Sequence, residues 1–497
     1  MSAAPADLLG ELTEWAAALR YRDIPPRTTE FARSQIISHL AGVRATLRHP
    51  LGRMLVGTFG APLGPDPARS AQALAALSLA LEYDEVGYSG HPSASAVSVA
   101  IAHAAAAGLD GERLITAVVA ANECAMRYQA STLLGSFFRG QSATYTHLIG
   151  TVAAYLHATG ADAECWVRAA RLAFGILPAP VERAFLCSDA KAFVAATPVR
   201  MALDACTAAA QGLTGAHGIL EADDGVLARL SDVPLPEAVV ARLGKRWHTD
   251  TLSFKRFPAS AYLQAPFECA ERLAAGHGPF AAAEVEDVRV DATLLTSLLD
   301  QKSAPHVVGA DSATAALTFS AGYGIGTLLL TGGFTTADLE PQACRNPDRW
   351  AVADKVRVNH DLALTAQMLT ATVPLGEALR QAGPRALELP AIKAFGAAAT
   401  QLLDSLGPTE DTFEAATMAI GARIVLRLCD GTELTEEVIS ATGMAGPLTA
   451  ATHQELAAAK FLGAGGDDNT LTELSRIDEL SPQELTDALT HALSCAP

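Results

Sequence analysis

Val285-Glu286-Asp287-Val288-Arg289-Val290 is the stretch where the hydrophobic pattern of this 497-residue chain changes from helical to strand-like. Its apolar and charged residues alternate, and a period of two is typical of a strand with one buried face. Most of the chain before it has apolar residues at helical spacing, starting with a run from Leu8 to Leu19 that we expect to end before Pro25. This order predicts a large helical region followed by a segment that contains a sheet.

Further strands are predicted downstream of this stretch. Lys355 to Val358 alternates in the same way, and two later strand-like runs are joined by the turn Asp430-Gly431. Helical patterns lie between the strands and return at the C-terminal end. We therefore predict a mainly α fold with an α+β lid, in which a large all-helical domain carries a smaller inserted α+β domain. The predicted parts are a helical domain at 1–261, a lid at 262–441 with a helical insertion at about 364–410, and a helical tail at 442–497 that rejoins the helical domain.

Composition and charge exclude several classes of partner. Half of the residues are apolar and 18% are charged, which is ample for a large buried core. The net charge of −18 comes from scattered acidic residues, and we expect no nucleic-acid partner because phosphate binding needs clustered Lys and Arg. The most apolar stretches are far shorter than the roughly 20 residues that span a bilayer, so no membrane partner is expected.

The cysteines and the N-terminal segment predict the cellular compartment. The eight cysteines are dispersed and include no CxxC pair, which is typical of reduced thiols in a cytoplasmic protein. Residues 1–12 lack a basic region followed by an apolar one, so no signal peptide is expected.

The segment Leu81-Glu82-Tyr83-Asp84-Glu85-Val86-Gly87-Tyr88-Ser89-Gly90-His91-Pro92 is the first candidate for chemistry. It connects two predicted helices and brings carboxylates, tyrosine side chains and a histidine together in a glycine-containing loop. Loops of this kind suit catalysis, because a rigid scaffold lets their side chains converge. The alternative is a solvated connection in which His91 is an ordinary loop residue.

Three further positions are candidates for ligand binding. Lys255 and Arg256 lie between two phenylalanines at the junction of the helical and α+β regions, which suits anion binding, although a surface turn fits equally well. Lys191 precedes an alanine-rich helix, where its positive charge is unfavourable because it opposes the helix dipole. Either an anionic ligand or ordinary solvation must compensate for this. Tyr323 lies in an apolar helix, where a core tyrosine with a bonded hydroxyl is the usual case.

The sequence shows no metal or dinucleotide motif. The histidines have no HExxH or comparable spacing, and we predict no metal site; His147 and His157 are more typical of a core or surface pair. Gly322, Gly324 and Gly326 lack both GxGxxG spacing and a preceding strand, so no dinucleotide fingerprint is supported.

Taken together, these segments resemble the MmgE/PrpD family, the group of 2-methylcitrate dehydratases and cis-aconitate decarboxylases. The order and spacing of the landmarks match the family over almost the whole chain. In chain order they are the acidic loop ending in His91-Pro92, Gly108-Leu109-Asp110-Gly111, Glu123, Gly150-Thr151-Val152-Ala153-Ala154, Lys191, Lys255-Arg256-Phe257-Pro258, Ser320 with Tyr323, Gly332-Gly333, Asp430-Gly431, Pro447-Leu448-Thr449 and Lys460-Phe461.

The resemblance implies a site between the helical domain and the lid, a homodimer, and no cofactor. It implies a lyase or isomerase that removes a proton next to a carboxylate or carbonyl and then eliminates, decarboxylates or returns the proton. By resemblance, His91 transfers the proton, Asp84 orients His91 or shares the proton work, Lys191 and Lys255 clamp carboxylates, and Tyr323 donates a hydrogen bond or proton. The remaining candidates for substrate binding are Glu82, Tyr88, Thr144, His147, Arg256 and Ser260.

The chain also departs from the family pattern. Glu82 stands in place of aspartate, Val86 in place of threonine, Thr144 where a catalytic histidine aligns, and Ser260 where histidine or cysteine is usual. Some 60 residues also lie between His360 and the next strand, where the family has a short connection, and we expect them to pack on the lid, cover the entrance or extend the dimer interface. These departures leave two alternatives to a lyase or isomerase for a small carboxylate. One is a tailoring isomerase, cyclase or dehydratase for a larger biosynthetic intermediate, and the other is a non-catalytic binding protein that retains the dimeric fold.

Overall fold

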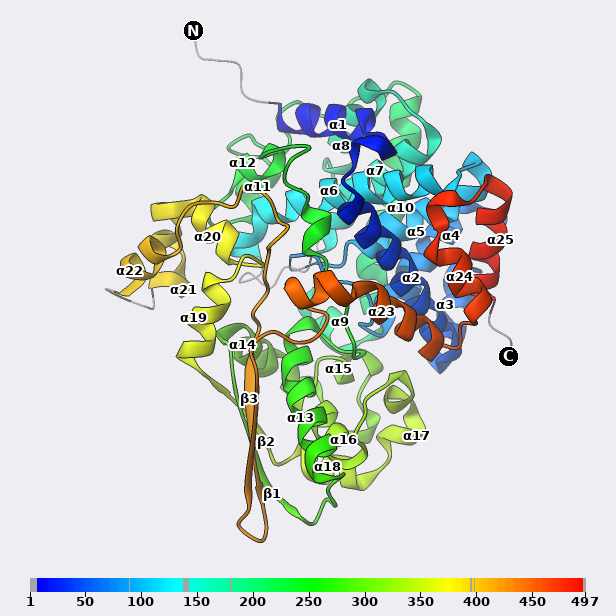
Figure 1. Cartoon of the computed structure of the whole chain (residues 1–497). Coiled ribbons are helices and arrows are strands. Elements are labelled where there is room, and N and C mark those ends of the chain that lie inside the picture. Colours follow the sequence, from blue (N-terminus) through cyan, green and yellow to red (C-terminus); the bar gives the residue numbers. More distant parts are fainter. Residues whose placement is uncertain are drawn as a thin grey trace.

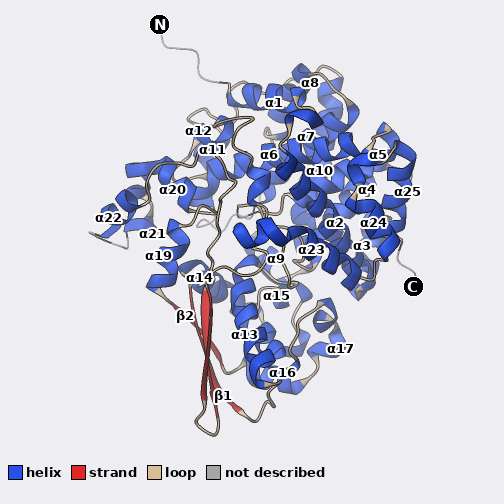
Figure 2. Cartoon of the chain, in the orientation of Figure 1, coloured by secondary structure: helices blue, strands red, loops and turns tan. Residues whose placement is uncertain are grey.

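The computed structural model describes residues 7–88, 90–136, 143–178, 181–393, 396 and 398–494. These residues are mainly helical, and their strands form one small four-stranded sheet at one end of the molecule (Figures 1 and 2). The fold class expected from the sequence is therefore confirmed.

Alanine-rich helices that pack closely on one another form the helical body. The approach of α7 to α5 is one example, because a Cβ added at Gly150 would lie only 2.6 Å from Ser95 Oγ. The helices of this body are α1 (Leu8–Ala18), α2 (Pro26–Arg48), α3 (Pro50–Phe59), α4 (Pro67–Ala80), α5 (Ser93–Ala107), α6 (Gly111–Ser136), α7 (Thr146–Thr159), α8 (Ala163–Ala173), α9 (Glu182–Cys187), α10 (Phe193–Ala210), α11 (Val226–Leu230) and α12 (Pro236–Val240).

Proline and glycine mark many helix ends, as their chemistry dictates. Pro26, Pro50 and Pro67 each occupy the first helical position, where the missing N–H has no intrahelical partner to lose. Gly108 and Gly160 follow α5 and α7 in the left-handed region, with φ of 59° and 69°, a conformation that glycine adopts readily at the end of a helix.

The sheet has the strand order β2-β1-β3-β4. Strand β1 (Val285–Ala292) pairs in parallel with β2 (Val356–His360) and antiparallel with β3 (Ala422–Leu428), which forms a hairpin with β4 (Glu433–Val438). Gly431 has a φ of 88°, so the predicted Asp430-Gly431 turn is present. Helices in this part of the chain are α13 (Gln264–His277), α14 (Leu294–Ser303), α15 (Thr314–Leu317), α16 (Ala321–Thr331), α17 (Pro341–Cys344) and α18 (Pro347–Ala353).

Two more groups of helices complete the chain. Between β2 and β3 lie α19 (Leu362–Thr370), α20 (Gly376–Ala382), α21 (Pro390–Lys393) and α22 (Ala398–Ser405), and α20 packs on α6 of the helical body. After β4, α23 (Pro447–Gly463) and α24 (Asp468–Ser475) pack on α2, and α25 (Pro482–Leu493) packs on α5 (Figure 1). The C-terminal tail therefore returns to the helical body.

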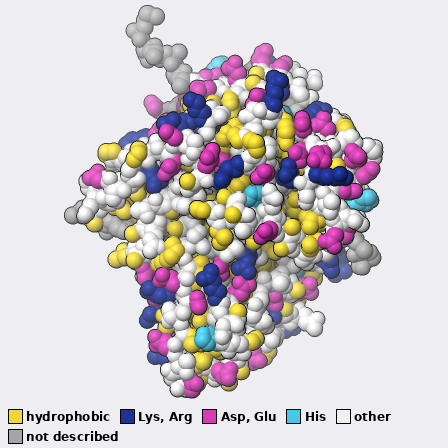
Figure 3. Space-filling model, in the orientation of Figure 1, with side chains coloured by type: hydrophobic (Ala, Val, Ile, Leu, Met, Phe, Trp, Pro, Cys, Tyr) yellow, Lys and Arg dark blue, Asp and Glu magenta, His cyan; other side chains and the backbone are white. Residues whose placement is uncertain are grey.

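Three findings concern the surface, the thiols and the character of the helices. On the face drawn in Figure 3, Lys and Arg side chains are interspersed with Asp and Glu and do not gather into one basic patch. The seven cysteines within the described ranges are all free thiols. None of the described helices combines the length and the apolar character needed to cross a membrane.

Candidate active site

The acidic loop between α4 and α5 is held against the segment that follows residue 251. Val86 and Ser253 form a short antiparallel bridge, in which each backbone N–H donates to the other residue's carbonyl oxygen at 3.0 and 2.8 Å. This bridge brings Lys255 beneath the loop. Ser89 of the same loop lies outside the described residues.

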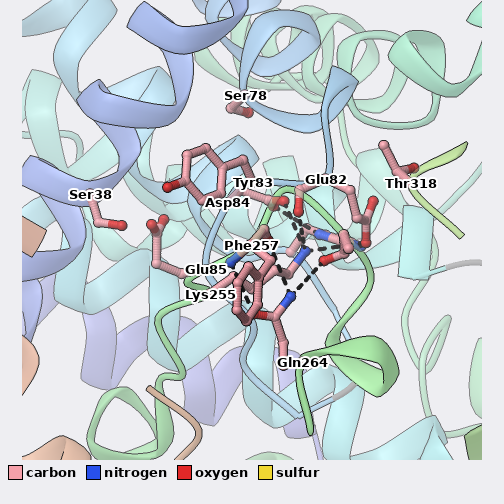
Figure 4. Close-up of polar contacts among 12 residues, drawn as sticks. Ser38, Ser78, Glu82, Tyr83, Asp84, Glu85, Lys255, Phe257, Gln264 and Thr318 are labelled. Atoms are coloured by element: carbon pink, nitrogen blue, oxygen red, sulfur yellow. Dashed lines mark hydrogen bonds and ion pairs between the residues drawn. The ribbon is translucent and has the colours of Figure 1, made fainter. Parts of the chain in front are cut away.

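Four buried charged side chains meet at this loop (Figure 4). Glu82 pairs through Oε2 with Lys191 Nζ at 2.7 Å and through Oε1 with Lys255 Nζ at 3.2 Å. Lys255 Nζ also lies 3.5 Å from Asp84 Oδ1 and donates to the backbone oxygen of Glu82 at 3.0 Å. Lys191 donates in addition to Thr318 Oγ1 at 3.3 Å. The two lysines that the resemblance assigns to substrate carboxylates therefore have carboxylate partners within the protein.

The ion pairs set the ionisation of these groups. Burial alone would raise the pKa of Glu82, but Lys191, Lys255 and His91 together lower it from 4.5 to about 2. Burial also opposes ionisation of Asp84, whose pKa is nevertheless held well below its usual range by His91 and Lys255. Loss of hydration lowers the pKa of Lys191, and Glu82 partly restores it. At neutral pH the carboxylates are ionised.

His91 is positioned by the same two carboxylates. Its Nδ1 lies 2.8 Å from Asp84 Oδ2, and its Nε2 lies 3.6 Å from Glu82 Oε1. A carboxylate accepts only, so Nδ1–H donates to Asp84 and Nε2 is left as the basic nitrogen. The ring is 13% exposed and lines a cavity. The structure thus joins His91 to Asp84 as a positioned pair.

The third carboxylate of the loop, Glu85, has a partner in the C-terminal tail. Lys460 of α23 lies with Nζ 3.5 Å from Glu85 Oε1, donates to Ser38 Oγ at 2.9 Å, and also donates to the backbone oxygen of Tyr83. Glu85 and Lys460 are both buried. Three carboxylates and three ammonium groups therefore balance one another around the loop.

Two residues of the loop have an unusual backbone conformation. Glu82 and Tyr88 have positive φ, at 54° and 56°, which side chains with a Cβ rarely adopt. A conformation of this kind costs roughly 1–3 kcal/mol and is concentrated at functional sites. Both residues line the cavity, so the strained positions lie where the loop faces it.

The cavity has a volume of about 200 Å³ and a lining that includes several polar side chains. His91, His147, Glu82 and Ser260 lie among its lining residues. Most other lining side chains are apolar and come from α6, α14, α19 and α20, together with residues between and after them. A largely apolar pocket with a few convergent polar groups is the usual form of a small-molecule site.

The other candidates divide into two groups. Tyr88, His147 and Ser260 line the cavity with His91, and burial lowers the pKa of His147 to about 3, so its ring is neutral. Thr144 is buried but does not appear in the lining. Arg256 is turned towards α13, where its Nη2 pairs with Glu271 at 2.9 Å.

Tyr323 lies away from the cavity lining. Its hydroxyl donates to the backbone oxygen of Asp338 at 2.6 Å and accepts from Arg349 Nη1 at 3.1 Å. Tyr323 is therefore a core tyrosine whose hydroxyl is hydrogen-bonded, which is the usual case for a tyrosine in an apolar helix.

Several lining residues carried no signal in the sequence. Tyr262 and Phe319 contribute to the cavity, and Thr318, which binds Lys191, precedes Phe319. Ser260 N donates to the Thr318 oxygen at 3.0 Å, so these segments meet only through the tertiary fold. A spacing pattern within either segment would not have identified them.

Glu82, Asp84 and His91 also present oxygen and nitrogen atoms that all lie within 4.8 Å of one another, as metal ligands do. Lys191 and Lys255 already contact the same carboxylates, and a divalent cation there would face two ammonium groups. The donor set is therefore arranged for ion pairs within the protein.

The fold and the site together define a mainly helical protein in which a histidine–aspartate pair lies at the wall of a cavity. The MmgE/PrpD N-terminal domain model matches residues 10–238, and the MmgE/PrpD C-terminal domain model matches residues 257–381. The chain belongs to the MmgE/PrpD family, as its resemblance predicted. No individual curated protein matches it. The family match supports a dehydratase- or lyase-type enzyme.

Proposed function

We propose that this chain is a lyase or isomerase in which His91 removes a proton from a carbon next to a carbonyl or carboxylate. The observation that carries the proposal is the 2.8 Å contact between His91 Nδ1 and Asp84 Oδ2 at the wall of the cavity. Asp84 fixes the tautomer in which Nε2 is the base, and it stabilises the imidazolium that forms.

The carboxylates around His91 favour the charged product of this step. When Nε2 takes the proton, the imidazolium lies between Asp84 at 2.8 Å and Glu82 at 3.6 Å. The two lysines keep both carboxylates ionised, so they support the base indirectly. Lys191 and Lys255 act here as positioning residues.

The developing negative charge on the substrate oxygen needs a hydrogen-bond donor. We assign this role to His147, whose ring lines the same cavity and is neutral because of burial. Its Nδ1 lies 3.3 Å from Ser95 Oγ, which holds the ring in place. A neutral imidazole can donate a hydrogen bond from its N–H to the substrate oxygen.

The second half of the reaction uses the proton held by His91. Returned to a hydroxyl on the neighbouring carbon, it releases water and leaves a double bond. Returned to the original carbon from either face, it gives exchange or isomerisation. In a decarboxylation His91 would instead begin as the imidazolium: loss of a carboxylate as carbon dioxide leaves an enolate, and the carbon that lost the carboxylate takes the proton from His91 Nε2.

The test is exchange of α-protons with deuterated water across a panel of carboxylic acids and ketones, followed by NMR. The wild type should exchange at least one member of the panel, and His91→Asn should reduce that rate by about 10²–10⁴-fold, the usual contribution of general-base catalysis. Glu164→Gln is the matched control, because the Glu164 side chain on α8 is 79% exposed, and it should leave the rate unchanged. Exchange that survives in His91→Asn would refute the assigned base, and no exchange with any compound would favour the binding-protein alternative.

A further inference from the structure

The cavity beside His91 has an unusual division of charge. Among the described residues, no lysine or arginine lines it, although two lysines lie just behind the wall. Lys191 and Lys255 direct their ammonium groups to Glu82 and Asp84 at 2.7–3.5 Å. The part of the wall that the structure describes therefore presents no unpaired cation for a substrate with several carboxylates.

The carboxylates on the lining point to the same conclusion. Glu82 and Glu182 both contribute to the cavity surface, and Glu182 is paired with Lys302 at 2.7 Å. A multiply charged anion would have to lose its hydration next to these groups, without gaining a free cation in return. Such a ligand is electrostatically unfavourable at this wall.

The rest of the cavity is lined by an apolar wall. It is formed by leucines of α14, including Leu298, and by side chains from the segment between β2 and β3. In that segment Met368 lies on α19, Leu379 on α20 and Ile392 on α21. These three helices belong to the segment between β2 and β3, which is longer in this chain than in the family pattern.

We infer that the substrate has an extended apolar body, which lies against α14 and the segment between β2 and β3, with one carbonyl or carboxylate group at His91. The part of this inference that concerns the reaction at His91 rests on the proposed function. The part that concerns binding of the apolar body rests on the lining residues alone. The segment between β2 and β3 then sets specificity, because it supplies the wall that recognises the apolar body. An uncharged or singly charged hydrophobic intermediate fits this description.

The experiment uses 2-alkanones from 2-pentanone to 2-undecanone as probes, with citrate as the multiply charged comparison. Dissociation constants are measured by ligand-observed NMR, and α-deuterium exchange is followed in the same samples. Each added methylene should tighten binding by up to about fourfold, as long as it contacts the wall. The same length dependence should appear in His91→Asn, which lacks the base but keeps the wall.

Two leucine variants locate the binding surface. Leu379→Glu places a carboxylate on the wall and should weaken binding of 2-undecanone at least tenfold, while 2-pentanone changes little. Leu362→Glu is the matched control, because Leu362 lies in the same segment, is 67% exposed and does not line the cavity. It should bind every probe as the wild type does.

The outcomes separate the two proposals. Affinity that does not rise with chain length, or tighter binding of citrate than of 2-undecanone, overturns the inference on substrate class. Length-dependent binding without exchange leaves that inference intact and counts against the proposed reaction. The length series in the wild type decides the question even if Leu379→Glu fails to fold.

Discussion

Replacing Lys191 with methionine should strongly destabilise the protein, because it leaves a buried carboxylate without its closest partner. Lys191 Nζ lies 2.7 Å from Glu82 Oε2, and the two side chains are only 2% and 3% exposed. Methionine keeps the length and apolar character of the lysine stem, so the main change is loss of the ammonium group. Among the described residues, Lys255 at 3.2 Å is then the only lysine within ion-pair distance of Glu82.

The magnitude follows from the general cost of an unpaired buried charge, and the pKa of Glu82, which Lys191, Lys255 and His91 lower together, shows that its ionised form is stabilised by its partners. Removing one partner of a buried ion pair typically costs about 3–5 kcal/mol. The fall in the pKa of Glu82 from 4.5 to about 2 corresponds to ~3 kcal/mol of net stabilisation of its ionised form. Glu82→Gln should be destabilising for the converse reason. The double variant should recover about 2 kcal/mol or more relative to the sum of the single variants, since neither charge then stands alone.

Urea unfolding followed by circular dichroism gives the free energies of unfolding for this cycle. The matched control is Arg200–Asp204 on α10, an ion pair at 3.1 Å whose side chains are 47% and 63% exposed. Its cycle, Arg200→Met with Asp204→Asn, should give a coupling energy below about 1 kcal/mol. A Glu82–Lys191 coupling no larger than this control would refute the assignment of a strong buried ion pair.

The same pair makes an acid-sensitivity prediction. Because the folded-state pKa of Glu82 is depressed, its contribution is complete above the unfolded value of 4.5 and is lost as pH falls towards 2. The difference in stability between the wild type and Glu82→Gln should therefore shrink across that range. A difference that stays constant from pH 5 to 2 would contradict the depressed pKa.

Three further predictions concern other side chains. Burial lowers the pKa of His147 to about 3, so the stability that its neutral form contributes is complete above pH 6.5 and is lost as the pH falls. Between pH 7 and 5 the free energy of unfolding in urea should therefore fall by about 2 kcal/mol more in the wild type than in His147→Gln. Equal falls in the two proteins would refute the lowered pKa. Tyr88→Phe should be neutral or stabilising by up to about 1 kcal/mol, since its buried hydroxyl has no hydrogen-bond partner among the described residues; a loss above 1 kcal/mol would reveal a partner. Tyr323→Phe should cost about 1–2 kcal/mol through its bonds to Asp338 and Arg349 and leave kcat unchanged, whereas a tenfold fall in kcat would restore its proposed proton-transfer role.

The secondary structure was largely predictable because its determinants are local. The alternation in β1, the Asp430-Gly431 turn and the glycine after α5 each follow from residues within a few positions of one another. The apolar pattern around Tyr323 predicts a single helix at residues 311–330, and this prediction was wrong in extent, since the structure has α15 and α16 there, separated by a turn at residues 318–320. A continuous apolar pattern does not reveal such a break.

The partners of the site residues were much less predictable. The sequence identified Glu82, Lys191 and Lys255, but it placed all three in contact with substrate. Glu82 neutralises both lysines only because the fold brings distant residues together. Lys255, for example, lies 173 positions from Glu82 in the sequence. Tertiary contacts of this kind leave no periodic pattern. The apolar wall is similarly dispersed over α14, α19, α20 and α21.

The balance of charge in the loop has a consequence for recognition. The three carboxylates of residues 82–85 are matched by Lys191, Lys255 and Lys460, and all six groups are buried. Because these charges cancel, the loop exerts little net field on the cavity, and attraction of an anion cannot be the main source of affinity. What remains is hydrophobic contact with the wall and the directional chemistry of His91. Under the proposed function, charge in this site therefore serves to fix the base and keep its carboxylate partner ionised, while the shape and apolar surface of the cavity select the substrate.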